Sequence, residues 1–277
     1  MSNALTQAPQ KKTFSMAINS PTWQKMIADT LGDENRKKRF VSAVLSAVSA
    51  NQQLQNIQDH GSILSAAFLG EGLSLSPSPQ LGQYYMVPYG GKVQFILGYK
   101  GLMQLAMRSG QIKKLNAVPI KQGELKHFDP INEEISVMLI EDWDTRENAP
   151  TIGYYAFFEL TNGFRKSIYW SKKQMQAHAK RYSKGYNAFW GQSDDMFDTM
   201  AIKTILRQLI TKGGCPMSTE MISAIESDGA TGTVDFDKGE VIIDAVQPDG
   251  PIDVAANPTS PDDQSAAAGQ EMNLNDL

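Results

Sequence analysis

Residues 86 to 114 read MVPYGGKVQFILGYKGLMQLAMRSGQIKK, and within them the apolar pattern changes from the period of a strand to that of a helix. Two apolar runs flank Gly90 and Gly91, which permit the positive φ values of a tight turn, so the first half predicts a β-hairpin. The second half predicts a helix from Tyr99 to Ser109 that ends at Gly110. A hairpin thus leads directly into a helix.

Helices precede this stretch, and strands and then more helices follow it. The first predicted helix begins at Pro21 and ends at Gly32, and Asp33 caps a second helix. The clearest hairpin joins residues 151–160 to 164–170 through a Thr-Asn-Gly turn. This order is typical of an α+β fold with a largely antiparallel sheet, one interrupting helix, and flanking N- and C-terminal helices. The other predicted elements are a helix at 61–73, strands at 114–124 and 133–140, and helices at 171–182, 193–210 and 218–226.

Charge is distributed unevenly along the 277 residues. From Asp228 onward there are eleven acids and one base, a net charge of −10, whereas residues 1–227 hold 25 bases and 19 acids, a net charge of +6. A basic body with an acidic tail is the asymmetry expected of a nucleic-acid binder. The tail is rich in Asp, Gly, Pro, Ala and Ser, which favours disorder. We predict a flexible arm at 1–20, a folded domain at 21–227 and a disordered acidic tail at 228–277.

Composition and motifs argue against several classes of function. Hydrophobic residues make up 41% of the chain, enough for a core, and the single Cys215 leaves no internal disulfide, which fits the cytoplasm. We expect no signal peptide and no membrane span. The phosphate-binding pattern GxxxxGK[ST] is missing, so we expect no ATPase. His60, His127 and His178 lack metal-ligand spacing, and we predict no catalytic or metal-binding residue.

One acidic stretch supports an alternative function. Carboxylates at short spacing can hold two Mg²⁺ ions for phosphodiester hydrolysis. Against this, Asp142 and Asp144 adjoin the loop-like TRENAP, where acids are usually only solvated. A Mg²⁺-dependent nuclease therefore stays open as an alternative. Its candidate residues are His127, Asp129, Glu133, Glu134, Glu141, Asp142 and Asp144.

Cations share a face on three predicted helices. In the first, Lys100 and Arg108 stand two helical turns apart with Gln104 between them, so the face is not a ladder of salt bridges. The later helices repeat the pattern with Lys173, Lys180, Arg181 and Lys184, and with Lys203 and Arg207. Tyr182, Tyr186, Phe189 and Trp190 accompany them. Aromatics beside cations suit a groove that stacks bases and neutralises phosphates, although Phe189 and Trp190 could equally be core side chains.

A further run of cations, Arg36 to Arg39, stands at the N-terminus of the second predicted helix. Positive charge there opposes the helix dipole unless an anion comes close. The alternative is a solvated surface run. The sequence leaves both interpretations open.

Two blocks carry a family resemblance. Residues 84–118, YYMVPYGGKVQFILGYKGLMQLAMRSGQIKKLNAV, closely resemble the central motif of the RecT family of phage single-strand annealing recombinases. The block WSKKQMQAHAKRYSK at 170–184, followed by a Trp and by MFDTMAIKTILRQL at 196–209, resembles that family's second signature. The resemblance spans about residues 20–227. Relatives often carry two Lys before the Thr of the second block, where this chain has Ile202 and Lys203, which lowers the charge expected there.

This resemblance implies a protein that coats single-stranded DNA left by a partner exonuclease and anneals it to a complementary strand without ATP. It implies a homo-oligomeric filament or ring with DNA, single-stranded and then annealed, in an outer basic groove. No catalysis and no cofactor is implied; we expect Mg²⁺ only to modulate DNA binding, and a host single-strand-binding protein to be a candidate partner. A passive coat or scaffold on single-stranded DNA is the other alternative.

By position, the resemblance implies DNA contacts at Lys92, Tyr99, Lys100, Arg108, Lys203 and Arg207. The helical faces and the cations beside them add Lys113, Lys114, Lys173, Lys180, Arg181, Lys184 and Trp190. Such residues should contact the phosphate backbone with little sequence preference.

Overall fold

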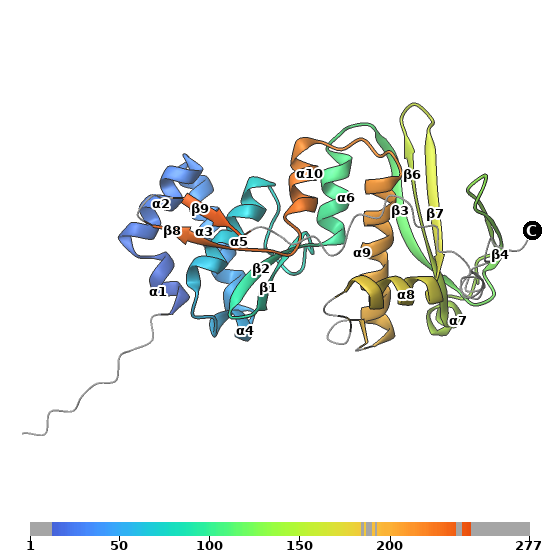
Figure 1. Cartoon of the computed structure of the whole chain (residues 1–277), viewed down its shortest axis with the longest axis horizontal. Coiled ribbons are helices and arrows are strands. Elements are labelled where there is room, and N and C mark those ends of the chain that lie inside the picture. The colour runs from blue at the N-terminus through green and yellow to red at the C-terminus, as the bar shows by residue number, and fades with distance from the viewer. Residues whose placement is uncertain (1–12, 184–185, 187–189, 192, 237–239, 245–277) are drawn as a thin grey trace, which may run out of the picture.

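The structure is a computed structural model that describes residues 13–183, 186, 190–191, 193–236 and 240–244. It confirms the α+β class, and the strand pairs of the described residues are antiparallel. Figure 1 shows an elongated molecule with the first five helices at one end and the sheet of β3, β6 and β7 toward the other. Helices α6, α9 and α10 stand side by side between them.

The N-terminal end is helical. Its elements are α1 (Phe14–Ile18), α2 (Pro21–Leu31), α3 (Glu34–Ser49), α4 (Gln52–Gln55) and α5 (His60–Gly72). The predicted caps hold: Gly32 ends α2 with φ 69°, and the Asp33 carboxylate accepts a 2.6 Å hydrogen bond from the Arg36 N–H at the start of α3. The flexible arm expected at 1–20 ends earlier, because Phe14 and Ile18 of α1 are buried in the core.

The first sheet confirms the predicted hairpin and corrects the predicted tail. Strands β1 (Tyr84–Tyr89) and β2 (Lys92–Leu97) pair across Gly90 and Gly91, whose φ values are 57° and 81°. β8 (Ala230–Asp235) pairs with β2, and β9 (Glu240–Ile243) pairs with β8. Disorder from Asp228 onward was therefore the wrong prediction for these two strands. Alternate β8 residues, Ala230, Gly232 and Val234, are buried, a strand pattern that small residues disguise.

The remaining strands form two further sheets rather than extending the first. α6 (Tyr99–Met107) leads into β3 (Ile112–Lys121), and β3 pairs with β6 (Thr151–Leu160), which pairs with β7 (Arg165–Ser171). A separate pair joins β4 (Leu125–Asp129) to β5 (Glu134–Val137). The other elements are α7 (Trp143–Asn148), α8 (Lys172–Tyr182), α9 (Asp194–Lys212) and α10 (Thr219–Glu226).

Helix α9 packs on the sheet of β3, β6 and β7. Its Asp198 accepts hydrogen bonds from the Tyr154 hydroxyl at 2.5 Å and the Thr151 hydroxyl at 2.8 Å, both on β6. Burial and the Asp198 carboxylate both raise the pKa of Tyr154, so the tyrosine stays a donor. The polar contact therefore sets the position of α9 along the strand.

Gly98, just before α6, and Gly101 within it allow the backbone to touch another part of the chain. A Cβ on Gly98 would lie 2.1 Å from the Gly82 carbonyl oxygen, and one on Gly101 would lie 2.1 Å from that of Gln83. Such distances are shorter than any side chain tolerates, so both positions require glycine. The close approach of this backbone is thus a contact within the protein.

Asp228 joins the two ends of the molecule. Its carboxylate is 7% exposed and accepts hydrogen bonds from the Leu97 N–H at 2.9 Å, from Lys203 Nζ at 3.2 Å and from Arg207 Nη1 at 2.7 Å. Arg207 also donates to the carbonyl oxygen of Ile225. One buried carboxylate therefore ties the end of β2 to α9 just before the chain enters β8.

Replacing Asp228 by Ala should lower the free energy of unfolding by about 3 kcal/mol, because two cations and a backbone N–H lose their buried acceptor. Urea denaturation measures this change. Asp29→Ala is the matched control, since Asp29 is exposed on α2 and has no partner in the described part of the chain. A loss equal to that of the control would contradict a structural role for Asp228.

Candidate nucleic-acid interface

Among the described helices and strands that contain no acid, helix α8 carries the most basic residues; its sequence is KKQMQAHAKRY. Ser171 and Gln174 form a capping box in which each side chain binds the other's backbone N–H. Met175 and Ala179 are buried, and α8 packs against β6 and β7. The cations of the helix lie outside this buried face.

Those cations differ in what they contact. Lys172 pairs with Asp194 at 2.9 Å, whereas Lys173 is exposed without an acidic partner in the part of the chain that the structure describes. Lys180 lies 5.8 Å from the ring centre of Tyr186, and Arg181 lies 5.1 Å from that of Tyr182. Because the last turn of a helix favours cations, Lys180 and Arg181 need no acid nearby.

A row of aromatic rings adjoins these cations. Trp170 lies 5.0 Å from His178 between ring centres, and His178 lies 4.7 Å from Tyr182. Burial, and then the charges of Lys212 and Arg181, lower the pKa of His178 to about 4, so the imidazole is neutral at pH 7. Trp170, His178, Tyr182 and Tyr186 are all only partly buried. We call these four aromatics with Lys173, Lys180 and Arg181 the α8 surface.

The prediction that Trp190 stacks on bases is wrong for this structure. Its side chain is 4% exposed and meets Phe197 edge-on at 5.1 Å between ring centres. The alternative interpretation, a core side chain, holds instead. The predicted contacts at Lys184 and Phe189 lie outside the described residues. The sequence analysis did not predict the contacts of Trp170 with His178 and of His178 with Tyr182. The second contact could have been predicted, because residues four apart on a helix lie on the same face.

The cations predicted on α6 and α9 are largely engaged within the protein. Lys203 and Arg207 bind Asp228, as described above. Arg108 donates to the carbonyl oxygens of Leu73 at 2.6 Å and Ser74 at 2.9 Å, where α5 ends, so its guanidinium satisfies carbonyls that the helix leaves unpaired. Lys100 is exposed and has no acidic partner among the residues described. Of the cations predicted on these two helices, Lys100 is therefore the one without a partner among the described residues.

The predicted strand residues also have partners. Lys92 pairs with Asp244 at 2.8 Å, which raises the pKa of its ammonium. In β3 the pairing register with β6 shifts between Ile112 and Lys114, so Lys113 is a bulge residue without a partner position on β6. The ammonium groups of Lys113 and Lys114 both lie near the Glu159 carboxylate, at 2.6 and 3.9 Å. Tyr99 is partly buried and packs against the core.

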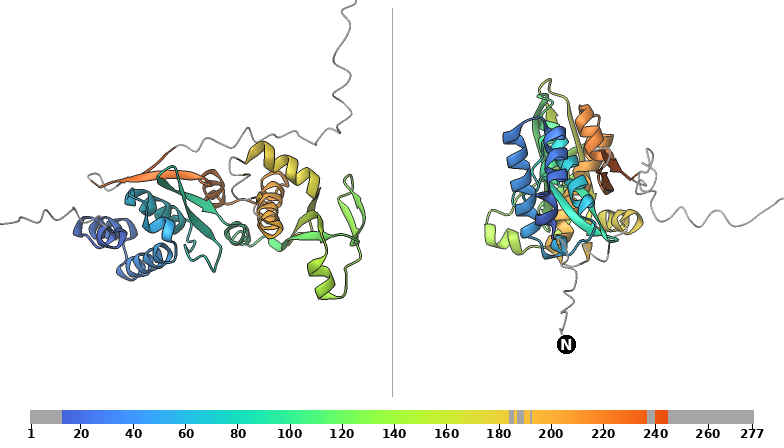
Figure 2. Two further views of the ribbon diagram at one scale, coloured as in Figure 1. Left: turned by 90° about the horizontal axis from the view of Figure 1, so that it is seen from below. Right: turned by 90° about the vertical axis from the view of Figure 1, so that its left-hand side faces the viewer.

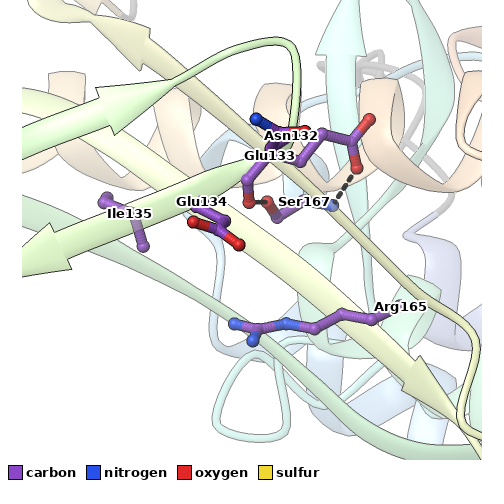
Figure 3. A pocket seen from close by; sticks show the side chains of 6 residues that line it. All are labelled: Asn132, Glu133, Glu134, Ile135, Arg165 and Ser167. Carbon is purple, nitrogen blue, oxygen red and sulfur yellow. Dashed lines mark hydrogen bonds between the residues drawn. The ribbon is translucent and has the colours of Figure 1, made fainter.

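The acidic stretch does not assemble a metal site. Within the described ranges no three His, Cys, Asp or Glu side chains lie close enough to hold an ion. Asp129 accepts N–H groups of its own turn, and Asp142 caps α7 at Thr145. Figure 3 shows the hollow beside them, of about 420 Å³, in which Glu133 turns toward Ser167 and Arg165 lies across from Glu134. In the described residues, the nuclease alternative therefore lacks a group of three such side chains that could hold a metal ion.

Helices long and apolar enough to cross a bilayer are also missing from the described part of the chain.

Comparisons with known proteins identify the family of the chain. The family model of RecT, described as the RecT family, matches residues 38–242, which include both the α8 surface and Asp228. The chain is 40% identical over 238 residues to the uncharacterized protein YqaK of Bacillus subtilis (strain 168), covering 84% of this chain and 80% of YqaK. It is 29% identical over 219 residues to protein RecT of Escherichia coli (strain K12), covering 76% and 78% of the two chains. This chain belongs to the RecT family.

Proposed function

We propose that the protein binds single-stranded DNA and anneals complementary strands in homologous recombination, without ATP. Membership of the RecT family supports a single-strand annealing recombination protein that associates with itself. The observation that carries the DNA-binding part is the α8 surface. There Lys180 and Arg181 lie beside the rings of Tyr186 and Tyr182, Lys173 is exposed on the same helix, and the three cations have no acidic partner in the described residues.

The chemistry of that surface suits a single strand. Lys173, Lys180 and Arg181 would neutralise consecutive phosphates, and the partly exposed rings of Tyr182 and Tyr186 would stack on bases. Lys100 on α6 would add a further phosphate contact. Because phosphates are the same in every sequence, binding should show little base preference.

Annealing itself makes and breaks no covalent bond. The protein would neutralise two phosphate chains while Watson–Crick pairing selects the partner strand. No nucleotide hydrolysis is needed, and Mg²⁺ would only compete with the cations for phosphates. A partner exonuclease would supply the single strand, and a host single-strand-binding protein would occupy it beforehand.

The purified protein should accelerate pairing of two complementary labelled oligonucleotides in buffer without ATP, measured by fluorescence energy transfer. A mixture with one non-complementary strand is the control. Binding without any acceleration would leave only the passive coat, and loss of an end label in Mg²⁺ would favour the nuclease.

The double variant Lys180→Ala/Arg181→Ala should flatten the dependence of log K on log salt for a single-stranded oligonucleotide by about 1.4, because each lost phosphate contact removes about 0.7. Fluorescence anisotropy over a range of NaCl concentrations measures the slope. Lys25→Ala is the matched control, since Lys25 is an exposed lysine on α2, at the other end of the molecule (Figure 1). Superimposable slopes for the double variant and the wild type would exclude α8 from the interface.

Saturation with an oligonucleotide should raise the pKa of His178 from about 4, because a phosphate beside Arg181 offsets the charge that disfavours the imidazolium. Nuclear magnetic resonance of the imidazole protons measures the titration, and His60 and His127 serve as internal references. An unchanged titration of His178 would place the DNA elsewhere.

A further inference from the structure

Residues 245–277, which lie outside the described residues, are strongly acidic: they hold six acids and no base. Apolar side chains stand among the acids from Glu271 to Leu277, where the sequence reads EMNLNDL. A single strand of DNA offers phosphates and bases, and carboxylates beside apolar groups offer the same two kinds of contact. We call residues 245–277 the acidic segment.

The fold fixes the point from which the acidic segment starts. The Asp244 carboxylate accepts hydrogen bonds from Lys92 Nζ at 2.8 Å and from the Thr231 hydroxyl at 2.9 Å. The Asp244 N–H donates to the Thr231 carbonyl oxygen at 2.8 Å. In both views of Figure 2, the β8–β9 pair and α8 lie on one side of the molecule and α7 lies on the other. The segment therefore starts on the side that carries α8.

The acidic segment is long enough to reach α8. Its 33 residues span up to about 110 Å when fully extended. That reach is roughly four times the length of α9, whose 19 residues measure about 28 Å. A tethered segment meets a site on its own chain at an effective concentration of about a millimolar, whatever the protein concentration. A contact too weak to join two separate molecules can therefore persist within one chain.

The α8 surface has the chemistry that the acidic segment requires. Lys173, Lys180 and Arg181 have no acidic partner in the part of the chain that the structure describes. The rings of Tyr182 and Tyr186 lie beside two of these cations and are partly exposed. Carboxylates can pair with the cations while methionine and leucine side chains pack on the rings.

The basic run on α3 is the alternative site for an acidic ligand. Two of its four cations already have acidic partners, at 2.6 and 3.5 Å. The other two, Lys38 and Arg39, are exposed. The aromatic residue that follows them, Phe40, is buried against Phe68 and offers no ring to a ligand. The α3 run therefore provides cations without the rings that α8 adds.

We propose that the acidic segment docks on the α8 surface of its own chain and is displaced when single-stranded DNA binds there. Carboxylates of the segment pair with Lys180 and Arg181, and Met272 and Leu274 pack on the neighbouring tyrosine rings. The inference rests on the proposed function, because it names what regulates access of DNA to that surface. The docked segment weakens DNA binding, since phosphates must first replace its carboxylates.

Carbodiimide coupling of the full chain without DNA tests the docking. The reagent joins a carboxylate to a lysine ammonium where the two are in contact, and mass spectrometry of the digested protein identifies the pairs. Links from the acidic segment to Lys173 and Lys180 should form, and they should be lost when an oligonucleotide saturates the protein. The Lys166–Glu133 pair should couple under both conditions and is the internal control.

Lys25 and Lys38 show whether the segment is docked or merely close. Both are exposed, on α2 and α3, at the end of the molecule where β9 lies (Figure 1), so an undocked segment meets them first. Equal links to these lysines and to those of α8, or links that persist at saturating oligonucleotide, would overturn the proposal. In a mixture of unlabelled and isotope-labelled protein, links between the two isotopes would contradict docking within one chain.

Neutralising the acidic segment should strengthen DNA binding. A quadruple variant should bind a single-stranded oligonucleotide about threefold or more tightly at low salt, because the DNA no longer competes with a tethered anion. The gain should vanish at about 0.5 M NaCl, where charges are screened. Fluorescence anisotropy measures both affinities. The substitutions are Asp249→Asn, Asp253→Asn, Asp262→Asn and Asp263→Asn.

A charge-matched control separates docking from a change in net charge. It replaces four exposed acids of the described residues, Asp29→Asn, Glu141→Gln, Asp144→Asn and Glu147→Gln, and should keep the wild-type affinity. Adding Lys180→Ala/Arg181→Ala to the quadruple variant should abolish its gain. An equal gain in the control, or a gain that survives this addition, would exclude docking on α8. The links formed without DNA do not depend on annealing, so failure of the docking and failure of the proposed function are distinguishable.

Discussion

The buried carboxylate of Asp228 is the contact on which the arrangement of the chain depends. It accepts the last N–H of β2 and two cations from α9, and it stands at the point where the chain turns back toward the first sheet. Removing this acid would be costly because it would leave two cations and a buried N–H without their acceptor. Lys203 and Arg207 are thereby committed to the fold, although their spacing on α9 suits phosphates equally well.

Local chemistry was enough to predict most elements. Pro21 and Gly32 bound α2, and Gly90 with Gly91 bound the first hairpin, because proline and glycine restrict or permit particular backbone angles whatever surrounds them. The division of the strands into three sheets was not predictable in this way. It depends on contacts between distant residues, such as the packing of Gly98 and Gly101 against residues 82 and 83.

The partners of the predicted cations could likewise be foreseen only in part. Sequence spacing identified faces on three helices, and on α8, which contains no acid, Lys173, Lys180 and Arg181 have no acidic partner among the described residues, whereas Lys172 pairs with Asp194 of α9. On α6 and β2, the partners of Arg108 and Lys92 come from Leu73, Ser74 and Asp244, which are remote in sequence. A charge pattern therefore predicts cations without acidic partners best where the element itself holds no counter-charge. The aromatic row beside α8 strengthens the pattern, because rings and cations together suit DNA better than cations alone.

The return of the chain into β8 has a mechanical consequence. The two ends of the molecule are joined by two crossings, one through α6 and one through residues 227–229, and Asp228 lies in the second. A single crossing would act as a swivel about which the ends could rotate. Two crossings restrict rotation of one end against the other more than a single linker would, and any tension along the long axis is shared between them.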